Sequence, residues 1–534
     1  MKFSREIFSG GVLFHGALIL ASVLFLYLFS YSTSPRYSTF GDDSTIFQAV
    51  GKCWAEGLLP YVGTFENKGP LLFAIDALGY LIYPRAGIML LQIPFMYFSL
   101  LFAWRAIELY WSRRATLAIW LLMIFWRASI FYEGNRTEEY SMPFLLAALY
   151  FFLRWLKSEA PSLPPRIGFI YGLGFGACVL LRTTNGLPIC CYALLTTIFL
   201  LKAGEFKNIC QNALNFCAGF VIICLPFVIY FAAHGALYDM LYGTILINIS
   251  HATSYNLSPS EFVRVMVPYA VVRFMIFGWF IAAILITLVF NPRSKLAWSG
   301  LVTGSAMLFM LLKSRPFYGY PELIISLFPL FFAVIHELKE ILSPSLKKFL
   351  RVRGFSPKRI FIKSSFILLV IVMLINLRVQ CMFFKETFEK NNFEVKNNAE
   401  VFSEFQKTIP AAERNSVVLW GESLSMGQFI LETDIKPRCR FFGNIQMFFG
   451  KSDPAVIDEW IQNVRSDYPA WIVYGALEEE YSGKEMDYFK YNFRRQRNPR
   501  VEEILAERYT LTDEAELYGQ KIKLYRLRTR EETH

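Results

Sequence analysis

Long apolar segments follow one another along most of the chain and are separated by shorter polar connections. A helix needs about 17–25 mostly apolar residues to cross the hydrocarbon core of a bilayer. Segments of this kind lie near residues 11–31, 87–111, 115–132, 140–156, 167–182, 186–203, 211–233, 265–290, 297–313, 321–337 and 364–380. The pattern predicts a mainly α-helical protein, a polytopic transmembrane bundle of about 11 spans.

The pattern changes after about residue 390, where charges recur every few positions and the apolar stretches shorten. Strands and helices that alternate in this way are typical of a small α/β domain. The sequence predicts strands at 416–421, 438–443 and 470–475, helices at about 397–408, 423–432 and 454–466, and a closing hairpin in ERYTLTDEAELYGQKIKLYRL. We therefore expect a transmembrane domain over residues 1–385 and an α/β domain over residues 390–534.

The composition agrees with a membrane protein and excludes a soluble enzyme of several domains. Hydrophobic residues make up 54% of the 534 residues and charged residues only 18%, whereas soluble proteins are about 25% charged. The net charge of +11 does not indicate nucleic-acid binding, because membrane proteins concentrate Lys and Arg in their cytoplasmic loops. The 9 Cys residues include no CxxC pair and show no metal-ligand spacing.

The distribution of Lys and Arg predicts the orientation. If the N-terminus is cytoplasmic, the inner loops carry roughly twice as many Lys and Arg residues as the outer loops. An odd number of spans then places the C-terminal domain on the extracytoplasmic side. Residues 32–86 form the first outer loop, which is too long for a simple connection.

The first outer loop holds two candidate functional features. Residues 45–56 have the periodicity of an amphipathic helix that lies along the membrane surface, with Asp42 and Asp43 at its start. Either carboxylate can serve as a helix cap or take part in chemistry. Lys68, in the rigid turn Lys68-Gly69-Pro70, either reaches the lipid headgroups or binds a phosphate.

Later outer segments add further charges beside apolar spans, where ionisable residues are costly unless they are paired or functional. The second outer loop carries Glu133, Arg136, Glu138 and Glu139, and later outer segments carry Arg182, Arg273, Lys313, Arg315, Tyr318 and Tyr320. A purely structural pair, such as Arg182 with an outer-loop carboxylate, is one interpretation. The other is a site at the membrane surface where a carboxylate is the general base and the cations stabilise a departing phosphate.

The motifs in these loops resemble those of the GT-C glycosyltransferase superfamily. The first loop contains Asp43-Ser44-Thr45-Ile46-Phe47, Gly57-Leu58-Leu59-Pro60-Tyr61 and Lys68-Gly69-Pro70, and the second loop contains GNRTEEYSMPF with Asn135, Thr137, Glu138, Glu139 and Pro143. They are most similar to bacterial members of the protein-mannosyltransferase-like group (glycosyltransferase family 39-like), which includes the aminoarabinose transferases.

The resemblance implies an inverting sugar transfer from a polyprenyl-phosphate donor, on the outer side of the bacterial cytoplasmic (inner) membrane. It implies that Asp43 is the base, that Lys68 contacts the carrier phosphate and that Glu138 organises the site. Relatives often have His in the late outer loop, where this chain has Tyr318-Gly319-Tyr320, so Arg315 and Arg182 are the further phosphate-binding candidates. Possible lining residues are Asp42, Glu139, Arg136, Arg273, Tyr318 and Tyr320. No cofactor is certain, although a divalent metal ion takes part in some relatives.

Other functions are compatible with part of the pattern. A transporter or lipid-linked glycan flippase would place its polar residues near the bilayer midplane, with paired repeats, whereas here they gather toward one face. A polymerase of surface polysaccharide would differ mainly in its donor, a diphosphate-linked glycan. The sequence leaves open whether the acceptor is a glycan, a lipid or a protein.

Overall fold

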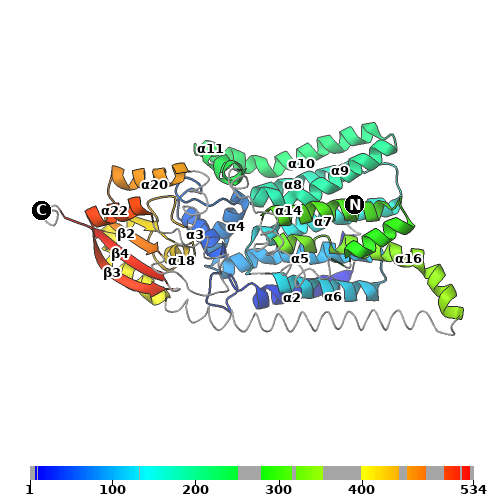
Figure 1. The fold of residues 1–534 in the computed structure, drawn as a ribbon, viewed down its shortest axis with the longest axis horizontal. Coiled ribbons are helices and arrows are strands. Elements are labelled where there is room, and N and C mark those ends of the chain that lie inside the picture. Colours follow the sequence, from blue (N-terminus) through cyan, green and yellow to red (C-terminus); the bar gives the residue numbers. More distant parts are fainter. Residues whose placement is uncertain are drawn as a thin grey trace.

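The computed structural model describes residues 7–8, 10–41, 43–131, 133–249, 278, 280–314, 320–352, 398–421, 423–443, 454–476, 498–517 and 520–529. The molecule is elongated, with a bundle of roughly parallel and antiparallel helices at one end and a small sheet at the other (Figure 1). The mainly helical fold is the one predicted. The predicted boundary between residues 385 and 390 lies outside the described residues.

Short connections between long apolar helices build the bundle. Its helices are α2 (Gly11–Phe29), α5 (Ala86–Glu108), α6 (Arg113–Ile130), α7 (Thr137–Ser158), α8 (Pro165–Arg182), α9 (Leu187–Lys202), α10 (Phe206–Ala233), α14 (Lys295–Ser314), α15 (Tyr320–Ile325) and α16 (Phe328–Val352). Among the described residues, four segments are long and apolar enough to cross a membrane, namely Gly11–Phe29, Ala86–Glu108, Pro165–Lys202 and Phe206–Ala233. The count of about 11 spans stays a prediction, since the segment at 364–380 and much of that at 265–290 lie outside the described residues.

Large apolar side chains fill the centre of the bundle and also cover its outside. Trp126 and Phe328 are buried in one core, with ring centroids 5.6 Å apart. On α10, by contrast, Leu214 and Ile222 are exposed. An exposed apolar helix face is costly in water and favourable in lipid, so this surface suits a membrane.

The first outer loop folds into two helices between the bundle and the sheet. They are α3 (Asp43–Ala55) and α4 (Pro70–Ile82), and Figure 1 shows both beside the sheet unit. The helix predicted at 45–56 is present, but residues 44–53 are buried on every side. The polar side of α3 is covered because α18 (Ser423–Glu432) packs against it, with the Cα of Gly427 so close that an added Cβ would lie 2.9 Å from Thr45.

The C-terminal sheet has four strands in the order β1-β2-β4-β3. The strands are β1 (Val417–Trp420), β2 (Trp471–Ala476), β3 (Tyr509–Leu517) and β4 (Gln520–Leu527). β1 and β2 are parallel, as expected for two strands joined by helices, and β3 and β4 form the predicted hairpin. The helices α20 (Pro454–Ser466) and α22 (Pro499–Arg508) pack beside the sheet.

The strand predicted at 438–443 is wrong. Its backbone meets β1 at an isolated bridge at Pro437 and through the bond from the Arg438 amide to the Val417 carbonyl, 3.0 Å long. It then turns toward the first outer loop, where the carbonyl of Arg440 accepts from the Phe65 amide at 2.9 Å. Phe441 is buried there without pairing in the sheet. A short apolar run predicts burial and does not by itself distinguish a strand from a buried loop.

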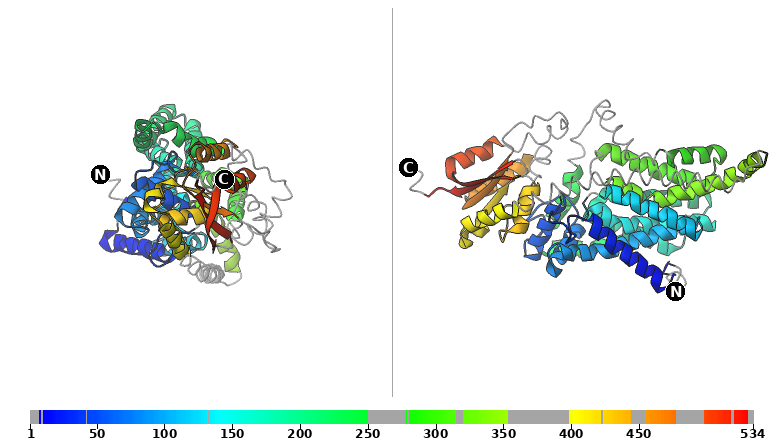
Figure 2. Two further views of the ribbon diagram at one scale, coloured as in Figure 1. Left: turned by 90° about the vertical axis from the view of Figure 1, so that its left-hand side faces the viewer. Right: turned by 90° about the horizontal axis from the view of Figure 1, so that it is seen from below.

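The sheet unit and the first outer loop share one hydrophobic core. Phe47 and Val50 of α3 belong to the same buried cluster as Leu419 of β1 and Phe429 of α18. The views in Figure 2 agree in placing the sheet unit over one end of the helices. The sheet unit is therefore packed onto the loop rather than suspended from it.

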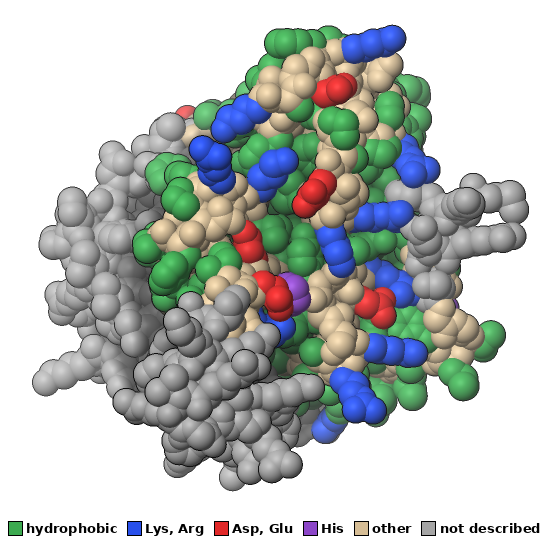
Figure 3. Space-filling view, turned by 90° about the vertical axis from the view of Figure 1, so that its right-hand side faces the viewer, with side chains coloured by type: hydrophobic (Ala, Val, Ile, Leu, Met, Phe, Trp, Pro, Cys, Tyr) green, Lys and Arg blue, Asp and Glu red, His purple; other side chains and the backbone are tan. Residues whose placement is uncertain are grey.

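Basic residues gather at the opposite end of the molecule, where Figure 3 shows Lys and Arg side chains over the helix ends. Three amines lie over aromatic rings there: Lys157 over Tyr110, Lys295 over Phe199 and Lys339 over Trp111. These contacts bring together connections that are far apart in the sequence. The bundle thus has one basic end and one end covered by the sheet unit.

Candidate active site

The second outer loop makes a tight turn that aims its charged residues at the start of α3. Gly134 and Asn135 have φ values of 80° and 55°, a left-handed conformation that Gly and Asn tolerate best. A Cβ at Gly134 would lie 2.0 Å from the Ser30 hydroxyl oxygen. The turn ends where α7 begins, which puts Glu138 and Glu139 in the first helical turn, a favourable position for carboxylates.

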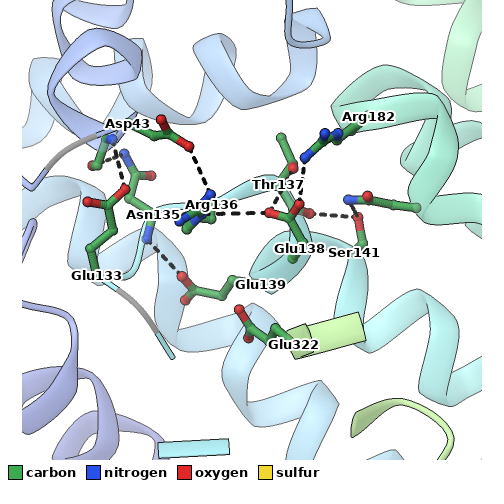
Figure 4. Close-up of polar contacts among 12 residues, drawn as sticks. Asp43, Glu133, Asn135, Arg136, Thr137, Glu138, Glu139, Ser141, Arg182 and Glu322 are labelled. Carbon is green, nitrogen blue, oxygen red and sulfur yellow. Dashed lines mark hydrogen bonds and ion pairs between the residues drawn. The ribbon is translucent and has the colours of Figure 1, made fainter. Parts of the chain in front are cut away.

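Four charged side chains from three separate segments form a continuous chain of contacts, which we call the outer ion-pair chain: Asp43, Arg136, Glu138 and Arg182 (Figure 4). The Arg136 guanidinium donates through Nη2 to Asp43 Oδ2 at 2.8 Å, and its Nε lies 3.9 Å from Glu138 Oε2. Arg182 Nη1 donates to Glu138 Oε1 at 3.0 Å. The predicted gathering of Asp43, Glu138 and Arg182 is therefore present in the structure.

Glu133 and Asn135 hold the start of α3 and leave the Asp43 carboxylate turned toward Arg136. The Ser44 amide donates to Glu133 Oε1 at 3.0 Å, and Asn135 Nδ2 donates to the Ser44 hydroxyl at 3.0 Å. The Tyr140 hydroxyl donates in turn to Asn135 Oδ1 at 2.7 Å. Glu133 thus binds one of the amides that a helix start leaves without an intrahelical partner.

The loop that carries Lys68 contacts both α8, which carries Arg182, and α3, which carries Asp43. Gly69 packs on the end of α8, where its amide donates to the Leu181 carbonyl at 2.8 Å, and an added Cβ would lie 2.0 Å from the Leu180 carbonyl oxygen. This places Lys68 beside the segment that carries Arg182. Lys68 Nζ also lies 5.4 Å from the ring centroid of Phe47, one turn along α3 from Asp43. The amine donates to Glu66 Oε1 at 3.1 Å and to Asn67 Oδ1 at 2.8 Å.

Exposure separates the residues that a substrate can reach from those that support them. The side chains of Asp43 and Arg182 are 36% and 28% exposed, whereas those of Arg136 and Glu138 are 4% and 1% exposed. Asp43 and Arg182 are thus the accessible ends of the chain, with a buried Arg136–Glu138 pair between them. Lys68 is partly accessible at 15%.

Glu138 and Glu139 precede the predicted span 140–156 and have opposite pKa shifts. Burial alone would raise the pKa of Glu138, but the cations of Arg182 and Arg136 outweigh burial and lower it. Burial and the nearby Glu322 carboxyl raise the pKa of Glu139 to about 8. Glu138 is therefore held ionised, whereas burial favours the protonated form of its neighbour Glu139.

A second group of polar side chains lies deeper, and we call it the inner polar layer: Gln92, Arg127, Glu139 and Glu322. Gln92 Nε2 donates to Glu139 Oε2 at 2.9 Å. Arg127 donates to Glu322 Oε1 through Nε at 3.1 Å and Nη2 at 3.0 Å, and both side chains are almost fully buried. The layer ties α5, α6, α7 and α15 together.

Several of these residues were not predicted from the sequence. Glu66, Gln92, Arg127 and Glu322 were not singled out, and neither was Asp76 of α4, whose burial raises its pKa well above the usual range. A signal was available, because a charged residue within an apolar run, as in FAIDALG, FWRASIF and YPELII, indicates a buried partner.

The remaining predicted residues cannot be placed in the site. Asp42, Arg273, Arg315 and Tyr318 lie outside the described residues, and Tyr320 begins α15 with a side chain that is not described. Their roles stay predictions. Within the described ranges, no group of three or more His, Cys, Asp or Glu side chains is placed to hold a metal ion, and metal dependence stays a prediction as well.

Comparison with protein-family models and with curated proteins finds no match. Solved structures do match. ArnT from Cupriavidus metallidurans bound to undecaprenyl phosphate is 12% identical, with a TM-score of 0.59 over 96% of this chain and 98% of ArnT. The apo structure of the same protein is 12% identical, with a TM-score of 0.56 over 95% and 98%.

The oligosaccharyltransferase AglB from Archaeoglobus fulgidus is 10% identical, with a TM-score of 0.45 over 86% of this chain and 69% of AglB. The match to the two ArnT structures extends over nearly the whole length of both chains, so the likeness includes the bundle, the first outer loop and the C-terminal sheet unit. The resemblance stated from the loop motifs is thus confirmed at the level of the fold, and the chain has the fold of ArnT.

Proposed function

We propose that the protein is a membrane glycosyltransferase that moves a sugar from a polyprenyl-phosphate donor to an extracytoplasmic acceptor with inversion. The outer ion-pair chain carries the proposal, because it presents one accessible carboxylate, Asp43, and one accessible cation, Arg182. Lys68 adds a second, partly accessible cation on a loop that contacts both α3 and α8. The ArnT structure of the same fold was solved with undecaprenyl phosphate bound, which supports a lipid phosphate as the donor.

The residues suit a single displacement. Asp43 accepts the proton of the acceptor nucleophile as that atom attacks the anomeric carbon of the sugar. The bond between this carbon and the phosphate oxygen breaks, and the phosphate departs with the lipid. Lys68 and Arg182 stabilise the charge that develops on the departing phosphate. Attack opposite to the leaving group inverts the anomeric carbon.

Arg136 and Glu138 set the geometry in this proposal. Arg136 holds the Asp43 carboxylate by a charge-assisted bond of 2.8 Å, and Glu138 holds Arg182 at 3.0 Å. Because both supporting side chains are buried, water competes little for these bonds. Substrate groups approach Asp43 and Arg182 from the exposed side.

The proposed orientation puts the site at the outer surface of the bacterial cytoplasmic membrane. The basic end in Figure 3 then faces the cytoplasm, in line with the positive-inside rule. The sheet unit lies over the opposite end, next to the site. The N-terminus is cytoplasmic and residues 390–534 are extracytoplasmic in this arrangement.

The proposal is tested with the purified full chain in liposomes. We expect the wild type to bind undecaprenyl phosphate and to release it from an undecaprenyl-phosphate sugar when a membrane extract supplies the acceptor. Asp43→Asn should lower this turnover by about 10²–10⁴-fold, the usual contribution of a general base, with little loss of lipid-phosphate binding.

The matched control is Glu108→Gln, which removes an Arg-paired carboxylate of similar exposure, 34%, from the pair Arg105–Glu108. This variant should retain full turnover. Wild-type turnover in Asp43→Asn would overturn the assignment of the base. Failure of the wild type to bind undecaprenyl phosphate would overturn the proposed donor.

A further inference from the structure

Arg440 of the C-terminal sheet unit is the centre of a contact cluster on the first outer loop. Its Nη1 donates to the Tyr61 carbonyl and to Asp239 Oδ1, both at 2.8 Å. Its Nε and Nη2 donate to the two carboxylate oxygens of Glu459, both at 2.6 Å. The guanidinium also lies 5.6 Å from the ring centroid of Phe65. Arg440 thus joins the sheet unit, the loop and the segment after α10.

The loop segment that Arg440 holds has a strained turn. Tyr61 has a φ of 70°, which is uncommon for a bulky side chain and persists only where the surroundings fix it. The Tyr61 amide donates to the Thr64 carbonyl at 2.6 Å. The bond from Arg440 to the Tyr61 carbonyl and the bond between the Phe65 amide and the Arg440 carbonyl brace the two ends of this turn.

Tyr61 connects this turn directly to Lys68. Its fully buried side chain donates from the hydroxyl to the Lys68 carbonyl at 2.8 Å. Packing keeps the ring in place, since its centroid lies 5.9 Å from that of Phe73 and 5.6 Å from that of Phe231. A displacement of Tyr61 would therefore move the backbone from which the Lys68 amine extends.

We propose that Arg440 is a positioning residue that acts through Tyr61 to place Lys68 for the donor phosphate. This inference rests on the proposed function. The sheet unit then contributes to phosphate binding without touching the donor. Arginine suits the position because its planar fork binds Glu459 with two donors while a third reaches Tyr61. A lysine keeps the charge but offers a single point donor and cannot make both contacts.

The test compares Arg440→Lys, Tyr61→Phe and the double variant in the full chain. Each single variant should raise the KM for the polyprenyl-phosphate donor about tenfold and leave the KM for the acceptor unchanged. A tenfold change is the effect of weakening one charge-assisted contact, here that between the Lys68 amine and the donor phosphate. The double variant should resemble the singles, because both changes break one connection. Hydrogen exchange of the amides at 61–69 should become faster in all three.

Arg438→Lys is the matched control. Arg438 lies two residues earlier and pairs with Asp467 at 2.7 Å, within the sheet unit, so this variant should keep the wild-type KM for the donor. Wild-type donor KM in Arg440→Lys, or multiplied effects in the double variant, would overturn the inference.

The two proposals fail in different ways. If the wild type does not use the lipid-phosphate donor, the proposed function fails whatever Arg440 does. If the wild type uses the donor and amide exchange at 61–69 is unchanged in Arg440→Lys, the positioning role fails and the proposed function stands.

Discussion

The outer ion-pair chain and the inner polar layer lie next to each other at one end of the helical bundle and differ in their access to the surface. In the outer chain, Asp43 and Arg182 are 36% and 28% exposed. In the inner layer, Arg127 and Glu322 are 1% and 3% exposed. Each contains an Arg–Glu pair at about 3 Å, Arg182–Glu138 in the outer chain and Arg127–Glu322 in the inner layer, so pairing alone does not indicate which group takes part in chemistry. The exposed fraction makes that distinction.

The boundary between the two falls between consecutive residues. Glu138 faces Arg136 and Arg182, whereas Glu139 faces Gln92 in the interior. Adjacent positions on a helix point in directions about 100° apart, which allows one helical turn to serve both groups. Of these two consecutive residues, Glu138 therefore belongs to the candidate site and Glu139 to the buried interior of the bundle.

The largest effect that this comparison predicts is on stability. Arg127→Met leaves the Glu322 carboxylate buried without its cation and should lower the free energy of unfolding by about 3–5 kcal/mol. The double variant Arg127→Met/Glu322→Met should recover most of this loss, because an apolar pair needs no desolvation of charge. The measurement is thermal unfolding of the purified protein.

The control for this prediction is Arg500→Met. Arg500 pairs with Asp458 at 2.7 Å, but the two side chains are 53% and 60% exposed. Exposed pairs contribute about 0–1 kcal/mol, so this variant should unfold almost as the wild type does. Equal stability of Arg127→Met and the wild type would show that the inner layer is not structural.

An intermediate effect is expected in the outer chain. Glu138→Gln removes the carboxylate that holds Arg182 and should slow transfer by about 10–100-fold, equivalent to about 1.4–2.7 kcal/mol. Donor binding should weaken as well, because Arg182 loses its orientation. Steady-state kinetics of the reconstituted protein test both changes, with Glu108→Gln as the reference. Transfer at the wild-type rate would place Glu138 outside the site.

The last prediction concerns pH dependence. The pKa of Glu139, about 8, is raised by burial and by Glu322, so the folded protein binds a proton that the unfolded chain releases near pH 4–5. This carboxyl should therefore destabilise the protein progressively as pH rises from about 5 to 8. Glu139→Gln resembles the protonated form, so its stability relative to the wild type should increase as pH rises from about 5 to 8.

The control for the last prediction is the same pair of proteins at pH 5. There Glu139 is protonated in the folded protein, and the difference in thermal midpoint between variant and wild type should shrink. A difference that is constant between pH 5 and pH 8 would contradict the raised pKa of Glu139.

Much of the fold could be predicted because apolar residues recur along the chain in runs and spacings that are typical of buried helices and strands. Long apolar runs located α5 and α10, and short apolar runs located β1 and β2. The hairpin of β3 and β4 was also predicted. The failure at 438–443 has a physical cause, since Phe441 is buried by the first outer loop, which is far away in the sequence. The local hydrophobic pattern predicts that a residue is buried, but it does not identify the segment that packs against that residue.

The amino-acid sequence by itself determined that charged residues flank apolar helices, and that Asp43, Lys68 and Glu138 are among them. The sequence also permits the turns at Gly69 and Gly134. At both positions a Cβ would collide with the backbone or side chain of a neighbour, so glycine is needed there. Only the tertiary structure decided that Arg136 joins Asp43 to Glu138, that Glu139 faces inward and that Arg440 braces the Lys68 loop. Such contacts depend on distances between side chains from separate elements, and packing sets those distances.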